Sequence, residues 1–329
     1  MRILANTNID FLKWRWVAIA ASAIVIGAGL LTVIARGSLP LGIDFTGGTA
    51  IVLRFNQEIP EDNLRQALAG LPGDKVVQRM YGSPAGTFDY QIRLPLTVQE
   101  ESGTSLDAPG AQAVQLLKSA NVGEFEIIGS EVVGPTIGKD LQRKGIYATL
   151  TALAGILVYI GFRFNFVFAA GAIVAVFHDI LITLAMLTWF GYDLSLNVVA
   201  AILTITGYSV NDTIVIFDRV RENQRMMRRE SLAKIVNTSV NQTLSRTVLT
   251  AGTTFLSVFA LFLFGGEVLR AFAFTMLVGI VVGTYSTVFI AAAIAIILQG
   301  GERSMAAQSV AQSQADAQSA RRSAKRARG

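Results

Sequence analysis

The chain has 329 residues, of which 52% are hydrophobic and only 16% charged, and its mean hydropathy is +0.50. Average chains are about 25% charged, so this composition excludes an ordinary soluble domain. The absence of cysteine excludes disulfide scaffolds, thiolate metal sites and cysteine nucleophiles. His178 is the single histidine, which excludes any site that needs two and argues against the common hydrolytic enzymes.

Residues 17–35 are the first candidate membrane span, because this run carries no charge. At 1.5 Å per residue it covers about 28 Å, close to a bilayer core of roughly 30 Å. The alternative is a cleaved signal peptide, whose apolar core usually has only about 7–15 residues. We therefore expect residues 17–35 to stay as a transmembrane helix that follows a cytoplasmic segment, 1–16.

Residues 36–145 have a net charge of −3 and a mixed pattern of strands and helices. The predicted elements, in order, are a strand at 50–55, a helix at 61–70, strands at 75–81 and 88–94, a helix at 111–120 and a strand at 124–133. This βαββαβ order predicts a ferredoxin-like α+β sandwich, and about a hundred residues suffice for one modest core. The segment contains no nucleophile–base pair or metal-ligand cluster, so we expect a module that binds or conveys motion.

Five further apolar runs make up the region 146–298, at 146–162, 164–189, 196–217, 247–264 and 271–298. Together with the first span they predict a polytopic α-helical membrane protein with six transmembrane helices. Six crossings put both termini on one side. The leading segment, Arg163, the connection 219–246 and the tail hold 17 Lys and Arg, whereas the two short opposing loops contribute only Arg270. The positive-inside rule then predicts cytoplasmic termini and an extracytoplasmic α+β domain.

Two basic segments are predicted on the cytoplasmic side. The loop 219–246 is expected to be partly helical and to lie against anionic headgroups. The tail 299–329, rich in Ala, Ser and Gln, is expected to be disordered until it meets anionic lipid or another acidic surface. Nucleic acid is not an expected partner, because aromatic interleaving and a recognition fold are missing.

Asp212 is the most informative residue, because a carboxylate deep in a span costs roughly 2.5–3.5 kcal/mol and marks a functional site by default. Helical steps back from Asp212 lead to a polar stripe formed by Tyr208, Thr204, Asn211 and Gly207. The next span has a matching face, with Arg246, Thr250, Thr253, Thr254 and Ser257. If the two helices are antiparallel neighbours, Arg246 comes within reach of Asp212. The pair then either exchanges a proton or is a static ion pair.

His178 and Asp179 form a second polar site near the middle of the third span. A proton relay and a simple hydrogen bond across a helix interface are equally good interpretations of this pair. Gly279 and Gly283 form a GxxxG pattern that close helix packing explains. The glycine-rich run 42–49 lacks the Gly-Lys-Ser/Thr of a phosphate-binding loop, and no metal or cofactor site is predicted.

Several motifs in order give the chain a specific resemblance. They are GIDFTGGT at 42–49, VGPTIG at 133–138, His178-Asp179, GYSVNDT at 207–213, DRVREN at 218–223 and QTLSRT at 242–247. The chain resembles the SecD/SecF family of membrane proteins that assist bacterial protein export, over about residues 10–298. The family belongs to the resistance-nodulation-division (RND) superfamily, and this chain is similar to its smaller, unfused subunits in the bacterial inner membrane.

The resemblance implies a function that spacing alone cannot indicate. It implies partnership with SecD, the SecYEG channel, other Sec accessory membrane proteins and the translocating preprotein. Protons are implied as the coupling ion, with Asp212 and Arg246 on the proton pathway and a further carboxylate supplied by SecD. Gly42, Asp44, Gly47 and Gly48 are implied in coupling the outer domain to the membrane helices. Two other classes remain as alternatives: half of a small-molecule exporter, and a passive assembly subunit.

Overall fold

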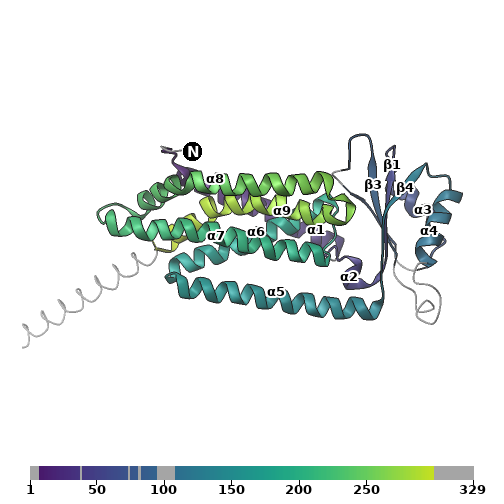
Figure 1. The fold of residues 1–329 in the computed structure, drawn as a ribbon, viewed down its shortest axis with the longest axis horizontal. Helices are drawn as coiled ribbons and strands as arrows, with labels where there is room; N and C mark the ends of the chain where they lie inside the picture. The colour runs from purple at the N-terminus through teal and green to yellow at the C-terminus, as the bar shows by residue number, and fades with distance from the viewer. Residues whose placement is uncertain (1–6, 38, 73–74, 81–82, 95–107, 300–329) are drawn as a thin grey trace, which may run out of the picture.

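The computed structural model describes residues 7–37, 39–72, 75–80, 83–94 and 108–299. In this part of the chain, six helices are long and apolar enough to cross a membrane, as the sequence predicts. They form an elongated bundle with the α+β domain at one end (Figure 1). The long helices are α1 (Arg15–Arg36), α5 (Pro135–Arg163), α6 (Phe166–Phe190), α7 (Leu196–Met226), α8 (Leu232–Phe264) and α9 (Gly266–Ser286).

The α+β domain, here called the sheet domain, confirms the predicted βαββαβ order. Its elements are β1 (Gly48–Phe55), α3 (Glu61–Ala67), β2 (Val76–Met80), β3 (Phe88–Leu94), α4 (Ala108–Ser119) and β4 (Phe125–Val133). The strands form one antiparallel sheet in the order β2-β3-β1-β4, the ferredoxin-like arrangement. Helices α3 and α4 cover one face. There Leu53, Phe55 and Tyr90, alternate residues of the strands, form a core with Leu64 of α3 and Leu117 of α4.

The opposite face of the sheet rests on the ends of the membrane helices (Figure 1). Val52 of β1 and Met80 of β2 belong to one buried cluster on this side of the sheet. The cluster also contains Leu187 of α6, Tyr192 from the connection between α6 and α7, and Val198 of α7. The central strand β1 is therefore buried on both sides, between the sheet domain's own helices on one side and the bundle on the other. This packing explains why β1 is almost continuously buried and shows no exposed polar face.

Three membrane helices are longer than the sequence predicts, because their extensions carry charges that a search for apolar runs rejects. Helix α5 begins at Pro135, and α7 and α8 continue well past the apolar runs at the end of the bundle remote from the sheet domain. The predicted loop 219–246 is therefore a helical hairpin whose turn is confined to residues 227–231. Its buried contacts include Val220, Val236 and Val240 and a hydrogen bond of 2.8 Å from Asn223 to Ser239. An apolar stripe between the two helices holds this hairpin together while its charges face outward.

Helix α9 packs closely on α7, as the GxxxG pattern predicts. A Cβ atom on Gly279 would lie 2.3 Å from the Ile205 side chain, and one on Gly283 would lie 3.0 Å from Ser209. After Ser286 the chain makes a π-helical turn, Thr287–Ala291, and remains helical to residue 299. Such turns often occur at functional positions within helices.

Candidate functional site

Asp212 lies where α7 and α8 meet, and its side chain is almost fully buried, with 8% of the residue exposed. The Thr247 hydroxyl on α8 donates a hydrogen bond of 3.0 Å to Asp212 Oδ1. Thr247 is itself 1% exposed. The carboxyl is thus enclosed by protein and has a polar partner, which is the environment expected of a functional acid inside a membrane span.

Arg246 does not make the direct contact with Asp212 that the sequence suggests. No ion pair within 4 Å joins the two residues in the described part of the chain, and Arg246 is exposed. The reason is geometric, since successive helical residues point about 100° apart. Because Thr247 faces α7, the preceding Arg246 turns away from it. Spacing along the sequence identified the correct level of α8 but not the residue that faces Asp212.

The remaining predicted polar residues form an outward surface beside Asp212, here called the polar face. Asn211 and Arg246 each precede a residue of the Asp212–Thr247 contact. Both residues are exposed, and α7 and α8 are in contact with each other. The exposed residues of the polar face are Thr204, Gly207 and Asn211 of α7, and Arg246, Thr250, Thr253 and Ser257 of α8.

Two neighbours of the polar face differ in exposure. Tyr208 is half-buried and packs against the apolar cluster between α7, α8 and α9, and Thr254 is also half-buried. The hydroxyls of Thr250, Thr253 and Ser257 donate to carbonyls of their own helix. Within the described ranges the Asn211 amide and the Arg246 guanidinium have no such hydrogen bond, and both are costly to leave in hydrocarbon. The polar face therefore requires protein or water against it.

His178 and Asp179 lie at the centre of a buried network that joins four helices. His178 Nε2 lies 2.8 Å from Ser22 Oγ on α1, and His178 Nδ1 lies 2.9 Å from Asp179 Oδ1. Asp179 Oδ2 accepts hydrogen bonds from Ser209 on α7 at 2.5 Å and from Ser286 on α9 at 2.9 Å. A buried carboxylate with this many donors is well satisfied. The network accounts for the helix-joining interpretation, and the relay interpretation stays a prediction.

The glycine-rich segment 42–49 leads into β1 and makes the contact between the sheet domain and the start of α7. It contains a short helix, α2 (Ile43–Thr46), followed by Gly47 and Gly48 with φ angles of +70° and +126°. Asp44 Oδ2 accepts a hydrogen bond of 2.8 Å from the backbone N–H of Leu196, at the first turn of α7. Gly42 N donates to the Leu194 carbonyl at 2.9 Å. A carboxylate at a helix N-terminus also complements the helix dipole.

Close backbone packing explains why this segment needs its glycines. A Cβ atom on Gly138 of α5 would lie 3.0 Å from Gly47 N, and one on Gly42 would lie 3.2 Å from the Leu194 carbonyl oxygen. The positive φ angles of Gly47 and Gly48 are also unfavourable for residues with side chains. The segment is thus wedged between α5 and the start of α7, in direct contact with both.

Two ion pairs, which the sequence did not predict, join the sheet to the bundle. Asp89 on β3 is fully buried and accepts hydrogen bonds from Arg54 at 2.7 and 2.8 Å and from Arg270 of α9 at 2.7 Å. Burial acts to raise the pKa of Asp89, but the hydrogen bonds and charges of Arg54 and Arg270 outweigh it and lower that pKa below its usual value. The sequence carries one sign of this contact: Arg54 and Asp89 are charged residues at strand positions whose neighbours in the chain belong to the core.

The second ion pair involves Asp193, in the connection between α6 and α7. Arg93 Nε of β3 lies 3.3 Å from Asp193 Oδ2, and Asp193 is 7% exposed. Burial raises the pKa of Asp193 to about 6, although the charges of Arg93 and Arg36 and the Gln91 side chain oppose that shift. Arg93 also donates to the Leu41 carbonyl at 2.5 Å. A carboxyl with a raised pKa thus lies at the boundary between the sheet and the bundle.

Comparisons with known proteins agree with this architecture. Residues 112–301 match the family model described as protein export membrane protein SecD/SecF, C-terminal, and residues 39–59 match the SecD/SecF GG motif. A protein translocase subunit SecF from Desulfurispirillum indicum is 42% identical over 86% of this chain and 89% of its own length. The corresponding protein from Escherichia coli O157:H7 is 37% identical over 92% and 91%.

Solved structures extend the likeness to three dimensions. The crystal structure of SecDF, a translocon-associated membrane protein from Thermus thermophilus, is 36% identical with a TM-score of 0.74. A crystal structure of SecDF in a super-membrane-facing form has the same identity and a TM-score of 0.65. This chain spans about two fifths of those longer chains, 40% and 41%, while they cover more than nine tenths of it. The chain belongs to the SecD/SecF family of protein export membrane proteins, as a SecF-type subunit of the Sec translocase rather than an enzyme.

Proposed function

We propose that this subunit works with a SecD-type partner to use the proton-motive force for preprotein translocation through SecYEG, after the ATP-driven stage. The observation that carries this proposal is the position of Asp212, enclosed beside Thr247 and next to an outward polar face. An acid in this place can take up and release a proton. The motif resemblance of 207–213 and 242–247 assigns the same role to Asp212 and Arg246.

The polar face is the proposed contact with the SecD-type partner. A relative from Thermus thermophilus is named SecDF and has a longer chain, of which the matching part is 39%. In the proposed assembly, Asn211 and Arg246 meet a helix of the partner that supplies a further carboxylate. Thr204, also on this face, and the half-buried Tyr208 line the proposed proton pathway. Arg246 then acts across the subunit interface instead of pairing directly with Asp212.

The proposed location is the bacterial inner membrane, with cytoplasmic termini and the sheet domain on the outer side. The distribution of Lys and Arg supports this orientation. The basic helical hairpin 219–246 and the tail then meet anionic lipid. On the outer side, the sheet domain is free to meet the emerging preprotein, and other Sec accessory membrane proteins complete the set of partners.

Coupling between proton and preprotein is proposed to run along α7. This helix is continuous from Leu196, which Asp44 binds, past Asp212. One elementary charge that crosses the membrane releases about 2.3 kcal/mol per 100 mV, enough to bias a two-state packing equilibrium strongly. Protonation of Asp212 removes a charge beside the polar face and changes the preferred α7–α8 packing. Gly42, Asp44, Gly47 and Gly48 transmit that change to the sheet domain.

The test is an Asp212→Asn variant, studied with its SecD-type partner in inverted membrane vesicles. We expect normal assembly but no stimulation of preprotein export by the proton gradient. Asp218→Asn is the matched control, because Asp218 lies on the same helix but pairs with Arg163 at 2.5 Å and is partly exposed. Export that remains fully gradient-dependent in Asp212→Asn would refute the proton role and leave a passive assembly subunit as the better interpretation.

Arg246→Ala separates the interface from the acid. We expect this variant to lose gradient-dependent export as well, while the Asp212–Thr247 contact stays intact. Leu256→Ala is its control, since Leu256 is an exposed residue of α8 outside the polar face. If Arg246→Ala exported normally, the proposed role of the polar face would be wrong even with an essential Asp212.

A further inference from the structure

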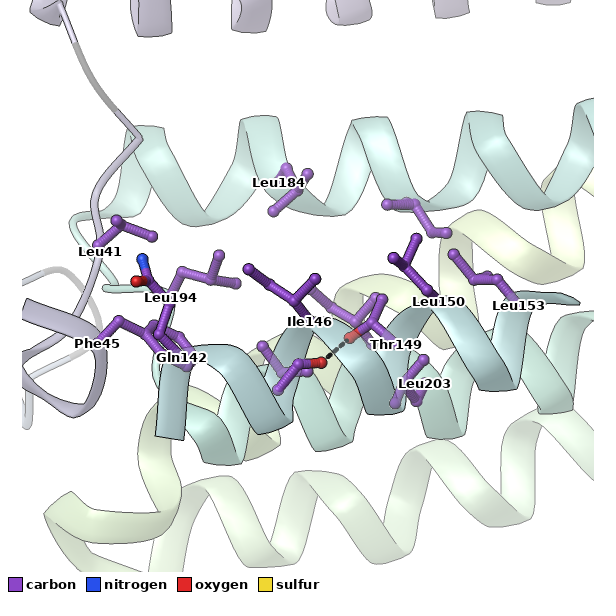
Figure 2. Close-up of a pocket in the computed structure, with 14 residues that line it drawn as sticks. Leu41, Phe45, Gln142, Ile146, Thr149, Leu150, Leu153, Leu184, Leu194 and Leu203 are labelled. Atoms are coloured by element: carbon purple, nitrogen blue, oxygen red, sulfur yellow. Dashed lines mark hydrogen bonds between the residues drawn. The ribbon is translucent and has the colours of Figure 1, made fainter. Parts of the chain in front are cut away.

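A cavity of about 380 Å³ lies between α5, α6 and α7, directly beneath α2. Figure 2 shows Ile146, Leu150 and Leu153 of α5 on one side and Leu184 of α6 on the other, with Phe45 at the end nearest the sheet domain. The polar side chains that line it are Gln142 and Thr149. The Thr149 hydroxyl is already used, since it donates to the Gly145 carbonyl at 2.8 Å. The cavity thus suits an apolar occupant.

This cavity lies beside exposed apolar residues of a candidate membrane span. Two of its wall residues, Ile146 and Leu150, are 53% and 60% exposed. Of the six candidate spans, α5 also buries the smallest share of its apolar part against the rest of the chain. What reaches the cavity from outside is therefore the hydrocarbon of the bilayer or a protein segment within it.

The length of the cavity matches one leaflet of a membrane. It extends along α5 from Gln142 to Leu153, a rise of about 16 Å. Half of a bilayer core of roughly 30 Å is about 15 Å. Leu153 consequently lies near the level at which an acyl chain from the nearer leaflet would end.

Two basic residues continue the cavity wall toward the membrane surface. Lys139 and Arg143 precede Ile146 by seven and three residues, so the three side chains lie on one stripe of α5. Both are exposed, and the Arg143 guanidinium lies 5.5 Å from the centre of the Tyr147 ring. A cationic end followed by an apolar groove is complementary to an anionic phospholipid.

We propose that this cavity binds one acyl chain of an anionic phospholipid from the leaflet at the sheet-domain end, with the lipid phosphate against Lys139 and Arg143. Phe45 and Leu194 line the cavity and also belong to the segments that join the sheet domain to α7. The acyl chain therefore fills a space directly beneath that junction and supports its packing. This site is separate from the basic hairpin at the other end of the bundle.

Native mass spectrometry of the full chain, released from membranes in mild detergent, tests the proposal. We expect one phosphatidylglycerol molecule to survive activation on the unaltered chain. The Ile146→Trp variant, in which the larger side chain fills the cavity, should retain phosphatidylglycerol several-fold less often. Val158→Trp is the matched control, because Val158 is an exposed residue of α5 outside the cavity. Equal lipid retention in all three proteins would overturn the proposal.

The headgroup and the nature of the occupant have their own tests. Lys139→Gln combined with Arg143→Gln should abolish the preference for phosphatidylglycerol over phosphatidylcholine, whereas Lys144→Gln should not, because Lys144 pairs with Asp140 at 2.8 Å. A photo-reactive residue in place of Leu150 should cross-link to lipid. Cross-linking instead to a partner subunit or to a translocating polypeptide would overturn the proposal.

A final measurement needs no variant and so does not depend on how well Ile146→Trp folds. The unaltered chain, once stripped of lipid, should gain thermal stability on addition of phosphatidylglycerol, and the gain should saturate. Phosphatidylcholine should give a smaller gain. A non-saturating response that is equal for both lipids would indicate bulk solvation only and would also overturn the proposal.

Discussion

Asp89 of the sheet domain and Arg270 of α9 are joined by a hydrogen bond of 2.7 Å, although 181 positions separate them in the chain. The Asp89 carboxyl is fully buried. Both of its oxygens also accept hydrogen bonds from Arg54. One carboxylate on β3 therefore balances two guanidinium groups, one from its own sheet and one from a membrane helix. This arrangement fixes the sheet on the bundle in one orientation.

Asp89→Asn should destabilise the protein by about 3–5 kcal/mol, because it removes the fully buried charge that accepts hydrogen bonds from Arg54 and Arg270. We expect a lower thermal midpoint in detergent and faster proteolytic release of the sheet domain. Asp62→Asn is the matched control, since Asp62 makes an exposed pair with Arg65 in the same domain. Exposed pairs contribute only about 0–1 kcal/mol. Similar losses in both variants would contradict a special role for Asp89.

Asp193 should make stability depend on pH between about 4 and 6. Its pKa is raised from the usual 3.8 to about 6, so the folded protein holds this proton more tightly than the unfolded chain does. Its contribution to stability is therefore complete below about pH 4 and is lost as the pH rises through 6. At 1.36 kcal/mol per pKa unit, the change is at most about 3 kcal/mol.

Asp193→Asn should remove that dependence and be more stable than the unaltered chain above pH 6. Thermal unfolding between pH 4 and pH 8 measures both effects. Asp89 interferes little in this range, because its lowered pKa means that its contribution is lost only as the pH falls below the range. An unchanged slope with pH in Asp193→Asn would assign the dependence to another group.

Asp44→Ala should weaken the link between the sheet domain and α7. It removes the acceptor of the Leu196 N–H and should cost about 1 kcal/mol, as for other helix N-terminal partners. We expect a larger effect on export than on assembly with the SecD-type partner. Asp44→Asn keeps an oxygen acceptor and should restore most of the export. Failure of Asn to rescue would show that the charge, and not the hydrogen bond, is what the junction requires.

Gly279→Ala should destabilise the packing of α9 on α7 by about 1–3 kcal/mol, the usual cost of overpacking. The added Cβ would lie 2.3 Å from the Ile205 side chain. Gly252→Ala on α8 is the control, because a Cβ there meets nothing within 4 Å. Thermal unfolding should show a lower midpoint for the first variant and an equal or slightly higher one for the second. Equal midpoints would mean that α9 shifts without cost.

The sequence predicts the elements of this fold well and their ends less well. Uncharged runs identify six spans, and alternating patterns identify the strands of the sheet domain. Helix α8 begins at Leu232 rather than at 247 because the residues between are amphipathic, with charges on the outer side of a hairpin. A criterion based on the absence of charge ends a helix where the membrane ends, not where the backbone hydrogen bonds do.

The candidate site was predicted in part. Asp212 is conspicuous in the sequence, because an acid in an apolar run needs an explanation. Its partner Thr247 is not, because hydropathy shows which face of a helix is polar and not which residue points at its neighbour. The Asp89–Arg270 contact was also missed, since no local pattern relates residues so far apart in the chain.

The unbroken course of α7 has a mechanical consequence. Because α7 is one continuous helix from Leu196 past Asp212, about 24 Å away along its axis, we expect it to act as a lever rather than as a hinge. A tilt of about 5° around the level of the acid would displace the far end by about 2 Å, given that arm. A displacement of that size is enough to break one hydrogen bond at the sheet domain and form another.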